Sequence, residues 1–410
     1  MNSNLQSILV VNCGSSSIKF SLFPRHANEG QTSLLSGYVH FSVYSTKLTV
    51  HVLENKKEEE ILLSNSNCDV ERTLKLLLEF LHKKVAQDQI AAVAHRVVHG
   101  GERFTQSIVI NFEALAYLKT LSGLAPLHQD NNLEGIRIFS EAYPKALQIA
   151  CFDTGFHADL PVVETLVALP ASIRDLGIRR FGFHGLSYRY VASHLGQHSH
   201  KAMQRVVIAH LGSGASVCGI NEGKSIATSM GFSALDGLMM GTRCGTLDPG
   251  ILLYLLKQHY TLQQLESMLY KDSGLLGISG ISADMRTLRA SSMPSAALAI
   301  DLFTYRLVRE IGAIIACLGG IDVLVFTGGI GENDAVLRKK TSSALAYLGL
   351  KLDPSTNAAA TGGREVQAIH TIDSAVEMWV VPTDEANVAA QDAIALLYLN
   401  GTAVSRGSAY

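Results

Sequence analysis

One pattern constrains the fold of this chain more than any other, because it occurs twice. An apolar strand, a polar residue, a Gly/Ser turn and a second apolar strand follow one another in SILVVNCGSSSIKF, which begins at Ser7, and again in RVVIAHLGSGASV, which begins at Arg205. Short polar turns between apolar runs predict β-hairpins. One such hairpin in each half of the chain predicts a duplicated domain with a cleft between the copies, although hairpins are common and the repeat is weak by itself.

The remaining segments alternate between strand-like and helix-like patterns. Apolar residues with helical spacing occur from Val70 to Val85, and a long apolar helix is expected from about Ser295 to Leu318, ended by Gly319 and Gly320. The charged run KKEEE at 56–60 is expected to form a solvated turn, and FTGGIGEN is expected to be a strand followed by a Gly-rich turn. Alternating strands and helices predict an α/β protein.

Composition narrows the class of protein. The 410 residues suggest two or three domains, and 34 Lys and Arg against 36 Asp and Glu argue against a nucleic-acid partner. No apolar run approaches the roughly 18 residues of a membrane helix, and no secretory signal is visible at the start of the sequence. The six cysteines form no C-x-x-C pair, which suits a reducing compartment. We therefore expect a cytoplasmic protein.

Three Gly/Ser turns follow strands, at 12–17, 210–214 and 328–333. Glycine lets the backbone approach a ligand, and successive N–H groups with Ser hydroxyls can hold phosphate oxygens. Lys19, just after the first turn, could add a positive charge. None of the turns is a Walker loop or a dinucleotide fingerprint. Any one alone is more often structural, but three at strand ends favour a nucleotide site.

Charged residues also stand at distinctive places. Arg96 and Arg243 lie among apolar and glycine residues and would need an anionic partner, whereas most arginines form surface salt bridges. Asp153 and Glu385 follow strands, where carboxylates can hold Mg²⁺ directly or through water, although a helix N-cap is the competing interpretation for Glu385. His184, in RRFGFHG, is as easily structural as functional.

The motifs together resemble one family. NCGSSSIKF, HRVVHGGE, APLH, FDTGFH, FGFHG, HLG-G, MGTRCGTLDPG, SGLLGISGIS, FTGGIGEN and PTDE follow the order found in acetate kinases, from about residue 8 to 395. The resemblance implies two related actin-like (ribonuclease-H-like) α/β domains, with mixed sheets flanked by helices and an interdomain cleft. The first domain would comprise residues 1–150 plus 386–410, and the second, nucleotide-binding domain residues 151–385.

The resemblance also implies a role for each matching residue. The catalytic group would be Asp153, Arg96, Arg243, His184 and His128. The walls of the acyl pocket, beside Arg96, would be Val98, Leu127, Phe183 and Ala234. ATP or ADP would contact Lys19, Ser15, Ser17, His210, Leu211, Gly212, Ser213, Gly214, Asp284, Met285, Arg286, Gly329, Ile330, Gly331, Glu332 and Asn333. Mg²⁺, with Mn²⁺ as a substitute, would be held by Asn12 and Glu385.

The implied activity is reversible phosphoryl transfer from ATP to acetate by a homodimer that needs neither a membrane nor nucleic acid. Three departures from the family pattern, at Ser213, Asp130 and Ala234, leave the acyl chain length open, so propionate or butyrate kinase is the first alternative. An actin-like ATPase module that binds another protein is the second. The arginine pair argues against such a module, which needs no carboxylate site.

Overall fold

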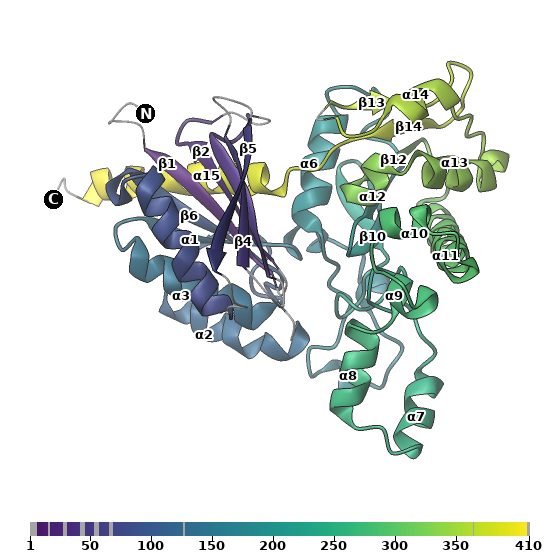
Figure 1. Cartoon of the computed structure of the whole chain (residues 1–410), viewed down its shortest axis with the longest axis horizontal. Helices are drawn as coiled ribbons and strands as arrows, with labels where there is room; N and C mark the ends of the chain where they lie inside the picture. The colour runs from purple at the N-terminus through teal and green to yellow at the C-terminus, as the bar shows by residue number, and fades with distance from the viewer. Residues whose placement is uncertain are drawn as a thin grey trace. The chain divides into compact units, whose positions relative to one another are not determined.

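The chain forms two compact units, which are described here one at a time (Figure 1). A computed structural model describes residues 6–14, 17–27, 31–41, 46–52, 57–64, 69–125, 128–363 and 365–407. The first unit comprises Met1–Gly155 and Asp384–Tyr410, and the second comprises Phe156–Thr383. The sequence-based division placed Asp153 and Glu385 in the second domain, whereas both belong to the first unit. Ser15 and Leu127 lie outside the described residues.

The first unit is built on an eight-stranded mixed sheet with the order β5-β4-β3-β2-β1-β6-β8-β7. Its strands are β1 (Ser7–Cys13), β2 (Ser17–Pro24), β3 (Leu35–Phe41), β4 (Thr46–Val52), β5 (Lys57–Ser64), β6 (Ile90–Val97), β7 (Ile108–Val109) and β8 (Leu147–Phe152). Its helices are α1 (Val70–Lys84), α2 (Phe112–Thr120), α3 (Gln129–Ala142) and α15 (Glu385–Gly407). Strands β1, β6 and β8 run parallel, and the hairpin partner β2 is antiparallel to β1.

Helices cover this sheet because its central strands are apolar on both faces. On one face, Leu9 and Val11 of β1 pack in a core with Leu77 of α1 and Phe139 of α3. Helix α15 contacts β1, β6 and β8. The helix predicted from Val70 onward is confirmed, and Asp69 caps it by accepting a hydrogen bond from the Arg72 backbone N–H at 2.8 Å.

The second unit is built on a six-stranded sheet with the order β11-β10-β9-β12-β14-β13. Its strands are β9 (Val206–Leu211), β10 (Ala215–Asn221), β11 (Lys224–Thr228), β12 (Val323–Thr327), β13 (Gln367–Ala368) and β14 (Glu377–Val380). Its helices are α4 (Val162–Thr165), α5 (Ala171–Arg174), α6 (Gly185–Leu195), α7 (Pro249–Lys257), α8 (Leu262–Tyr270), α9 (Gly274–Ser279), α10 (Met285–Ala290), α11 (Pro294–Leu318), α12 (Gly328–Asn333), α13 (Ala335–Ala344) and α14 (Pro354–Ala359).

In this unit, α6 and α11 both contact the central strands. Tyr188 and Val191 of α6 join a core with Ile208 of β9. Helix α11 packs against β9, β10 and β11. It begins at Pro294 and ends before Gly319, whose φ of 69° is in the left-handed region, as the sequence predicted for a glycine cap.

The two sheets share one arrangement, which confirms the duplication predicted from the hairpins. In each, a hairpin and its third strand (β1–β2–β3 and β9–β10–β11) continue on the other side into two parallel strands (β6 and β8, and β12 and β14). The fold is therefore a pair of related actin-like α/β domains.

Two local predictions were wrong. Residues 57–60 of the charged run are not a turn, because β5 begins at Lys57 and Glu60 forms an ion pair of 2.5 Å with Lys47 of β4. The segment after β12 is not an open turn but helix α12. The chain turns at Gly328, which has a φ of 77° and lies so close to the Leu211 backbone that a side chain would collide with it. None of the described helices is long and apolar enough to cross a membrane.

Candidate functional site

The first group of candidate residues stands where three parallel strands of the first unit end. Asn12 is near the end of β1, Arg96 near the end of β6, and Asp153 directly after β8. The register pairs Arg96 with Cys151, and the Asp153 backbone N–H donates to the Val97 carbonyl at 3.1 Å. Since parallel neighbours end at one edge of the sheet, the strands bring these three polar residues to the same edge.

A close cluster of charges forms at this edge. The Arg96 guanidinium donates from Nε to Asp153 Oδ1 at 2.9 Å and from Nη2 to Oδ2 at 2.6 Å, so it is gripped at two points. Glu385, the first residue of α15, places Oε2 3.3 Å from the same Nε. The Asp153 side chain is only 2% exposed, while Arg96 and Glu385 are 19% and 22% exposed. The cluster therefore opens to solvent on the side of Arg96 and Glu385.

The electrostatics of this cluster follow from its burial. Burial raises the pKa of the Asp153 carboxyl above its ordinary value, against the opposing charge of Arg96, and the neighbouring Glu385 carboxylate raises it further. Burial acts to lower the pKa of Arg96, but the two carboxylates outweigh it and raise that pKa, so Arg96 stays charged. Two carboxylates thus share one cation, and the cluster favours a further positive charge.

The oxygen donors at this edge fit a hydrated magnesium ion. In the part of the chain that the structure describes, no three His, Cys, Asp or Glu side chains gather into a metal-binding group. Mg²⁺ usually keeps several waters and binds through one or two carboxylates plus substrate phosphates. Glu385, which lies on the open side of the cluster, supplies one carboxylate, and the Asn12 side chain at the same edge supplies an amide oxygen.

The first Gly/Ser turn joins β1 to β2 beside this edge. The Gly14 N–H donates to the Ser17 carbonyl at 2.9 Å, and a side chain at Gly14 would collide with that carbonyl. Lys19 pairs with Asn12 across the hairpin, and its side chain is exposed. Strand β2 therefore places an exposed amine beside the polar strand end, as the sequence suggested.

Asn132, which sequence reasoning missed, ties the strand ends together. From α3, its side-chain Oδ1 accepts from the Val98 N–H at 3.0 Å, and its Nδ2 donates to the Cys13 carbonyl at 2.8 Å. Asn132 is 3% exposed. Cys13 follows Asn12, and Val98 lies two residues beyond Arg96, so one buried amide fixes the spacing of β1 and β6. The signal in the sequence was a polar residue on the buried face of a helix.

The second group of candidate residues surrounds the β9–β10 turn of the second unit. The Gly212 N–H donates to the Gly214 carbonyl at 3.0 Å, and the Ser213 carbonyl accepts from the Gly241 N–H at 3.1 Å. Ser213 is exposed at the tip of this turn. The turn is thereby tied to the segment that carries Arg243.

His184 lies beside this turn in a strained conformation. Its φ of 60° is in the left-handed region, unusual for a residue other than glycine, and it precedes α6. Its Nδ1 is 2.8 Å from the Ser216 hydroxyl of β10, and its ring stacks on His210 at 4.3 Å between centroids. Neighbouring contacts therefore fix both the ring plane and the position of the ring.

The Arg243 side chain lies beside Gly214 of the β9–β10 turn, as the His184 ring does. Its Nη1 donates to the Ala234 carbonyl at 2.7 Å. A side-chain carbon placed on Gly214 would lie 3.3 Å from His184 Nε2 and 3.6 Å from Arg243 Nη2. The structure therefore brings together His184, His210, Gly214 and Arg243, and both an imidazole nitrogen and a guanidinium nitrogen face the glycine of the turn.

The remaining predicted nucleotide residues sit at the starts of two short helices. Asp284 caps α10 and binds Arg286 through an ion pair of 2.6 Å. In α12, Glu332 Oε1 accepts from the N–H groups of Gly328 at 2.9 Å and Thr383 at 3.1 Å, which joins the ends of β12 and β14. Arg338, missed from the sequence, is fully buried and donates to the carbonyls of Gly331 and Glu332, so it holds the end of α12.

The predicted acyl-wall residues and His128 have mixed environments. Val98 and Phe183 are buried, at 7% and 1% exposure, and the Phe183 carbonyl is 3.0 Å from His157 Nε2. Ala234 is half-buried and contributes its carbonyl to Arg243. His128 is the N-cap residue of α3 without a side-chain capping bond. Asp130, in the first turn of α3, accepts from the Ser122 hydroxyl at 2.6 Å.

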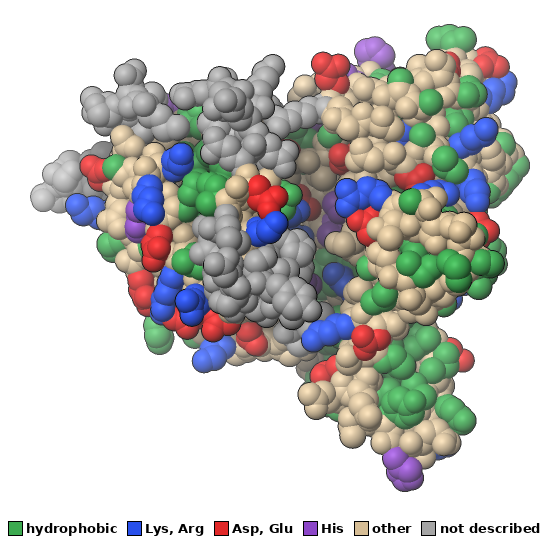
Figure 2. All heavy atoms as spheres, in the orientation of Figure 1, with side chains coloured by type: hydrophobic (Ala, Val, Ile, Leu, Met, Phe, Trp, Pro, Cys, Tyr) green, Lys and Arg blue, Asp and Glu red, His purple; other side chains and the backbone are tan. Residues whose placement is uncertain are grey.

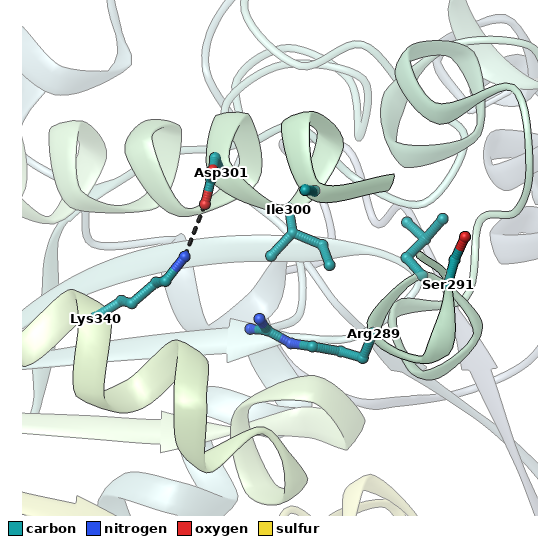
Figure 3. A pocket seen from close by; sticks show the side chains of 7 residues that line it. Arg289, Ser291, Ile300, Asp301 and Lys340 are labelled. Carbon is teal, nitrogen blue, oxygen red and sulfur yellow. Dashed lines mark hydrogen bonds and ion pairs between the residues drawn. The ribbon is translucent and has the colours of Figure 1, made fainter. Parts of the chain in front are cut away.

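A separate pocket of about 220 Å³ lies among α10, α11 and α13 (Figure 3). It contains none of the predicted site residues. Its two cations are already paired: Lys340 contacts Asp301 at 2.7 Å, and Arg289 contacts Asp334 at 2.9 Å. The pocket therefore offers no uncompensated charge to a ligand.

Comparison with known proteins places the chain in a family. The model of the acetokinase family matches residues 7–391. An acetate kinase of Rhodopseudomonas palustris (strain TIE-1) is 44% identical over 393 residues, which cover 92% of this chain and 95% of the relative. The crystal structure of Porphyromonas gingivalis acetate kinase has a TM-score of 0.84 at 34% identity, covering 96% of this chain and all of that one.

A propionate kinase from Francisella tularensis subsp. tularensis SCHU S4 is similar to the same degree. Its crystal structure has a TM-score of 0.85 at 36% identity and covers 94% of this chain and 98% of its own. The family model spans most of the sequence, and the relatives match over nearly their whole lengths. The chain belongs to the acetokinase family.

Proposed function

We propose that this chain transfers the γ-phosphoryl group of ATP reversibly to acetate, giving acetyl phosphate and ADP. The family is one of kinases that phosphorylate a carboxylate with ATP and a divalent metal. The observation that carries the proposal within the structure is Arg96, a guanidinium held at two points by a buried Asp153 at the polar edge of the sheet. A fixed guanidinium is suited to a small carboxylate or to a phosphoryl group.

The chemistry of the reaction matches these groups. Acetate is ionised at neutral pH, so the site needs no general base to create the nucleophile. One carboxylate oxygen attacks the γ-phosphorus as the bond to the leaving ADP oxygen breaks, and that oxygen retains the bonding electrons. The difficulty is to bring an anion onto a polyanion, which fixed hydrogen-bond donors overcome. In our proposal Arg96, Arg243 and His184 provide those donors.

We assign a supporting role to each remaining residue of the predicted site. Asn12 and Glu385 hold Mg²⁺, with Mn²⁺ as a substitute, and the bound ion reduces the charge of the phosphates. Lys19 and Ser17 serve the phosphates from the first unit. In the second unit the nucleotide contacts the segments 210–214, 284–286 and 329–333.

Propionate or butyrate as the acceptor is the alternative within the family. The propionate kinase of Francisella tularensis subsp. tularensis SCHU S4 is as similar in structure as the acetate kinase relative. By the resemblance, position 234 is Pro in some members of the family, and Ala234 in this chain leaves space for a longer acyl chain. An apolar pocket separates substrates that differ by one methylene by only about 1–3 kcal/mol, so we expect a graded preference for acetate.

The second part of this proposal is a homodimer that joins through α7. Every side of this helix is apolar apart from Lys257, yet none of its residues is buried, and Leu253 and Tyr254 are each 62% exposed. Hydrophobic side chains gather on the surface in the region of α7 and α8 (Figure 2). A helix that is apolar all round is normally covered. We propose that a second copy of the chain covers the apolar surface of α7.

A cytoplasmic location remains a prediction from the sequence.

One assay tests the activity directly. The protein is incubated with ATP, Mg²⁺ and acetate, propionate or butyrate, and acyl phosphate is trapped with hydroxylamine as the hydroxamate. We expect acetate to give the highest kcat/KM. A higher kcat/KM for propionate would move the assignment to the alternative. A rate of ATP hydrolysis that is unchanged by the addition of any of these carboxylates would contradict the proposal and favour an actin-like ATPase module.

A further inference from the structure

A buried chain of hydroxyl groups lies behind His184. The Tyr188 hydroxyl of α6 is hydrogen-bonded to the Ser216 hydroxyl of β10, and Ser216 Oγ is 2.8 Å from His184 Nδ1. The side chains of Tyr188 and Ser216 are fully buried. The relay runs from the core of the second unit to the imidazole that faces the β9–β10 turn.

The number of protons in this relay fixes the direction of each hydrogen bond. Among the described residues, the Tyr188 hydroxyl has Ser216 as its hydrogen-bond partner, and burial raises the pKa of Tyr188 well above its ordinary value, so the phenol keeps its proton. A buried phenol proton needs an acceptor, and Ser216 Oγ is in place to be that acceptor. Ser216 then directs its own proton to His184 Nδ1.

An imidazole that accepts at Nδ1 carries its proton on Nε2. That nitrogen is the one that faces Gly214, beside Arg243 Nη2. Protonating Nδ1 as well would require Ser216 to accept from the ring, and the hydroxyl proton of either Ser216 or Tyr188 would then be buried without an acceptor in the relay. Within the second unit, the Arg243 guanidinium and the stacked ring of His210 lie beside His184, and a neighbouring cation disfavours an imidazolium.

We propose that Tyr188 and Ser216 are positioning residues that hold His184 as a neutral imidazole with its proton on Nε2. His184 then presents a hydrogen-bond donor to the phosphoryl oxygens over a wide pH range, without depending on protonation of the ring. The catalytic half of this inference rests on the proposed phosphoryl transfer. The tautomer itself rests only on the geometry of the relay.

Nitrogen NMR of histidine-labelled protein tests the tautomer without any measurement of activity. The ring signals of His184 are assigned by their loss in His184→Gln. In the unsubstituted protein we expect Nε2 to be the protonated nitrogen. In Tyr188→Phe, Ser216 no longer accepts from the phenol and is free to accept from the ring, so the Nδ1–H form becomes populated. Predominant Nδ1–H in the unsubstituted protein would overturn the inference, even if every variant failed to fold.

Kinetics test the catalytic half. The neutral Nδ1–H form of the ring has no proton on Nε2 to donate, whereas the protonated ring has one. In Tyr188→Phe we therefore expect kcat to fall at neutral and alkaline pH and to recover towards acid pH, with KM for acetate little changed. Tyr190→Phe removes a phenol from the same helix, where the ring stacks on His194, and should leave the profile unaltered. An unaltered profile in Tyr188→Phe, despite a populated Nδ1–H form, would overturn the catalytic role. Absence of acetate-dependent turnover in the unsubstituted protein would instead refute the proposed function and leave the tautomer intact.

Discussion

Replacing Asn132 by alanine should loosen the first unit at the strand ends that carry Asn12 and Arg96. The substitution removes two hydrogen bonds, to the Val98 N–H and the Cys13 carbonyl, and leaves both backbone groups buried. Each unsatisfied buried group costs about 1–3 kcal/mol. Alanine recovers about 0.5 kcal/mol of helix propensity in α3. We therefore expect local stability to fall by about 2–5 kcal/mol.

The measurement must report on the first unit alone. The chain has one tryptophan, Trp379, which lies on β14 of the second unit, so its fluorescence does not report on Asn132. Hydrogen exchange resolved by peptide is suitable, with β1 and β6 as the reporting segments. We expect both to lose protection, and kcat to fall because Asn12 and Arg96 are no longer held at one spacing.

A matched control separates the lost bridge from the loss of an amide in general. Asn131→Ala makes the same chemical change one residue earlier on α3, at a position that is only half-buried. We expect a small effect there. A change below about 1 kcal/mol for Asn132→Ala, equal to that of the control, would show that water or a backbone shift replaces the bridge and would refute the reasoning.

Three further predictions follow from the structure. Arg96→Ala and Arg243→Ala should each lower kcat by a factor of at least about 10²–10³, because each removes a hydrogen-bond donor to the phosphoryl group that is transferred. Circular dichroism should show that the fold is intact. Near-normal turnover in either variant would refute that assignment. Leu253→Asp should shift the molar mass measured by light scattering from that of a dimer to that of a monomer. Lys257→Asp, which replaces the only charged residue of α7, should preserve the dimer. If Leu253→Asp is still a dimer, α7 is not the interface. Acid should destabilise the fold, because burial lowers the pKa of three histidines from 6.5 to about 4: His95, His99 and His157. Their pKa values are lowered in the folded state, so the stability they contribute is present above pH 6.5 and is lost as pH falls towards 4. Thermal unfolding across that range checks the sign, and a melting temperature that stays constant or rises towards pH 4 would contradict it.

The periodic elements could be predicted because their signals are local. The helix at α1 has apolar residues at helical spacing and an Asp cap, and α11 has a glycine stop. The errors occurred where a distant partner decides the conformation. Residues 57–60 form part of a strand because β4 pairs with them. Residues 328–333 form a helix because Gly328 fits against Leu211 and Glu332 accepts from the Gly328 N–H.

The candidate site divides in the same way. Asp153 was predicted from its place after a strand, Arg96 from its apolar and glycine neighbours, and Asn12 from the resemblance to acetate kinases. Nothing in the sequence indicated that Asp153 grips Arg96 at two points while Glu385 approaches the same nitrogen. Asn132, Ser216 and Tyr188 were missed because each acts through a partner that is remote in sequence.

Sequence alone determined the strands and helices with strong periodicity, the duplication of the hairpin unit, and the polar residues that follow strands, because these features depend on neighbours along the chain. The tertiary structure decided which charges share a partner, which protons have an acceptor, and which buried amide bridges two strands. Those interactions act over a few ångströms between residues far apart in the chain, so only the packed fold brings them within reach of one another.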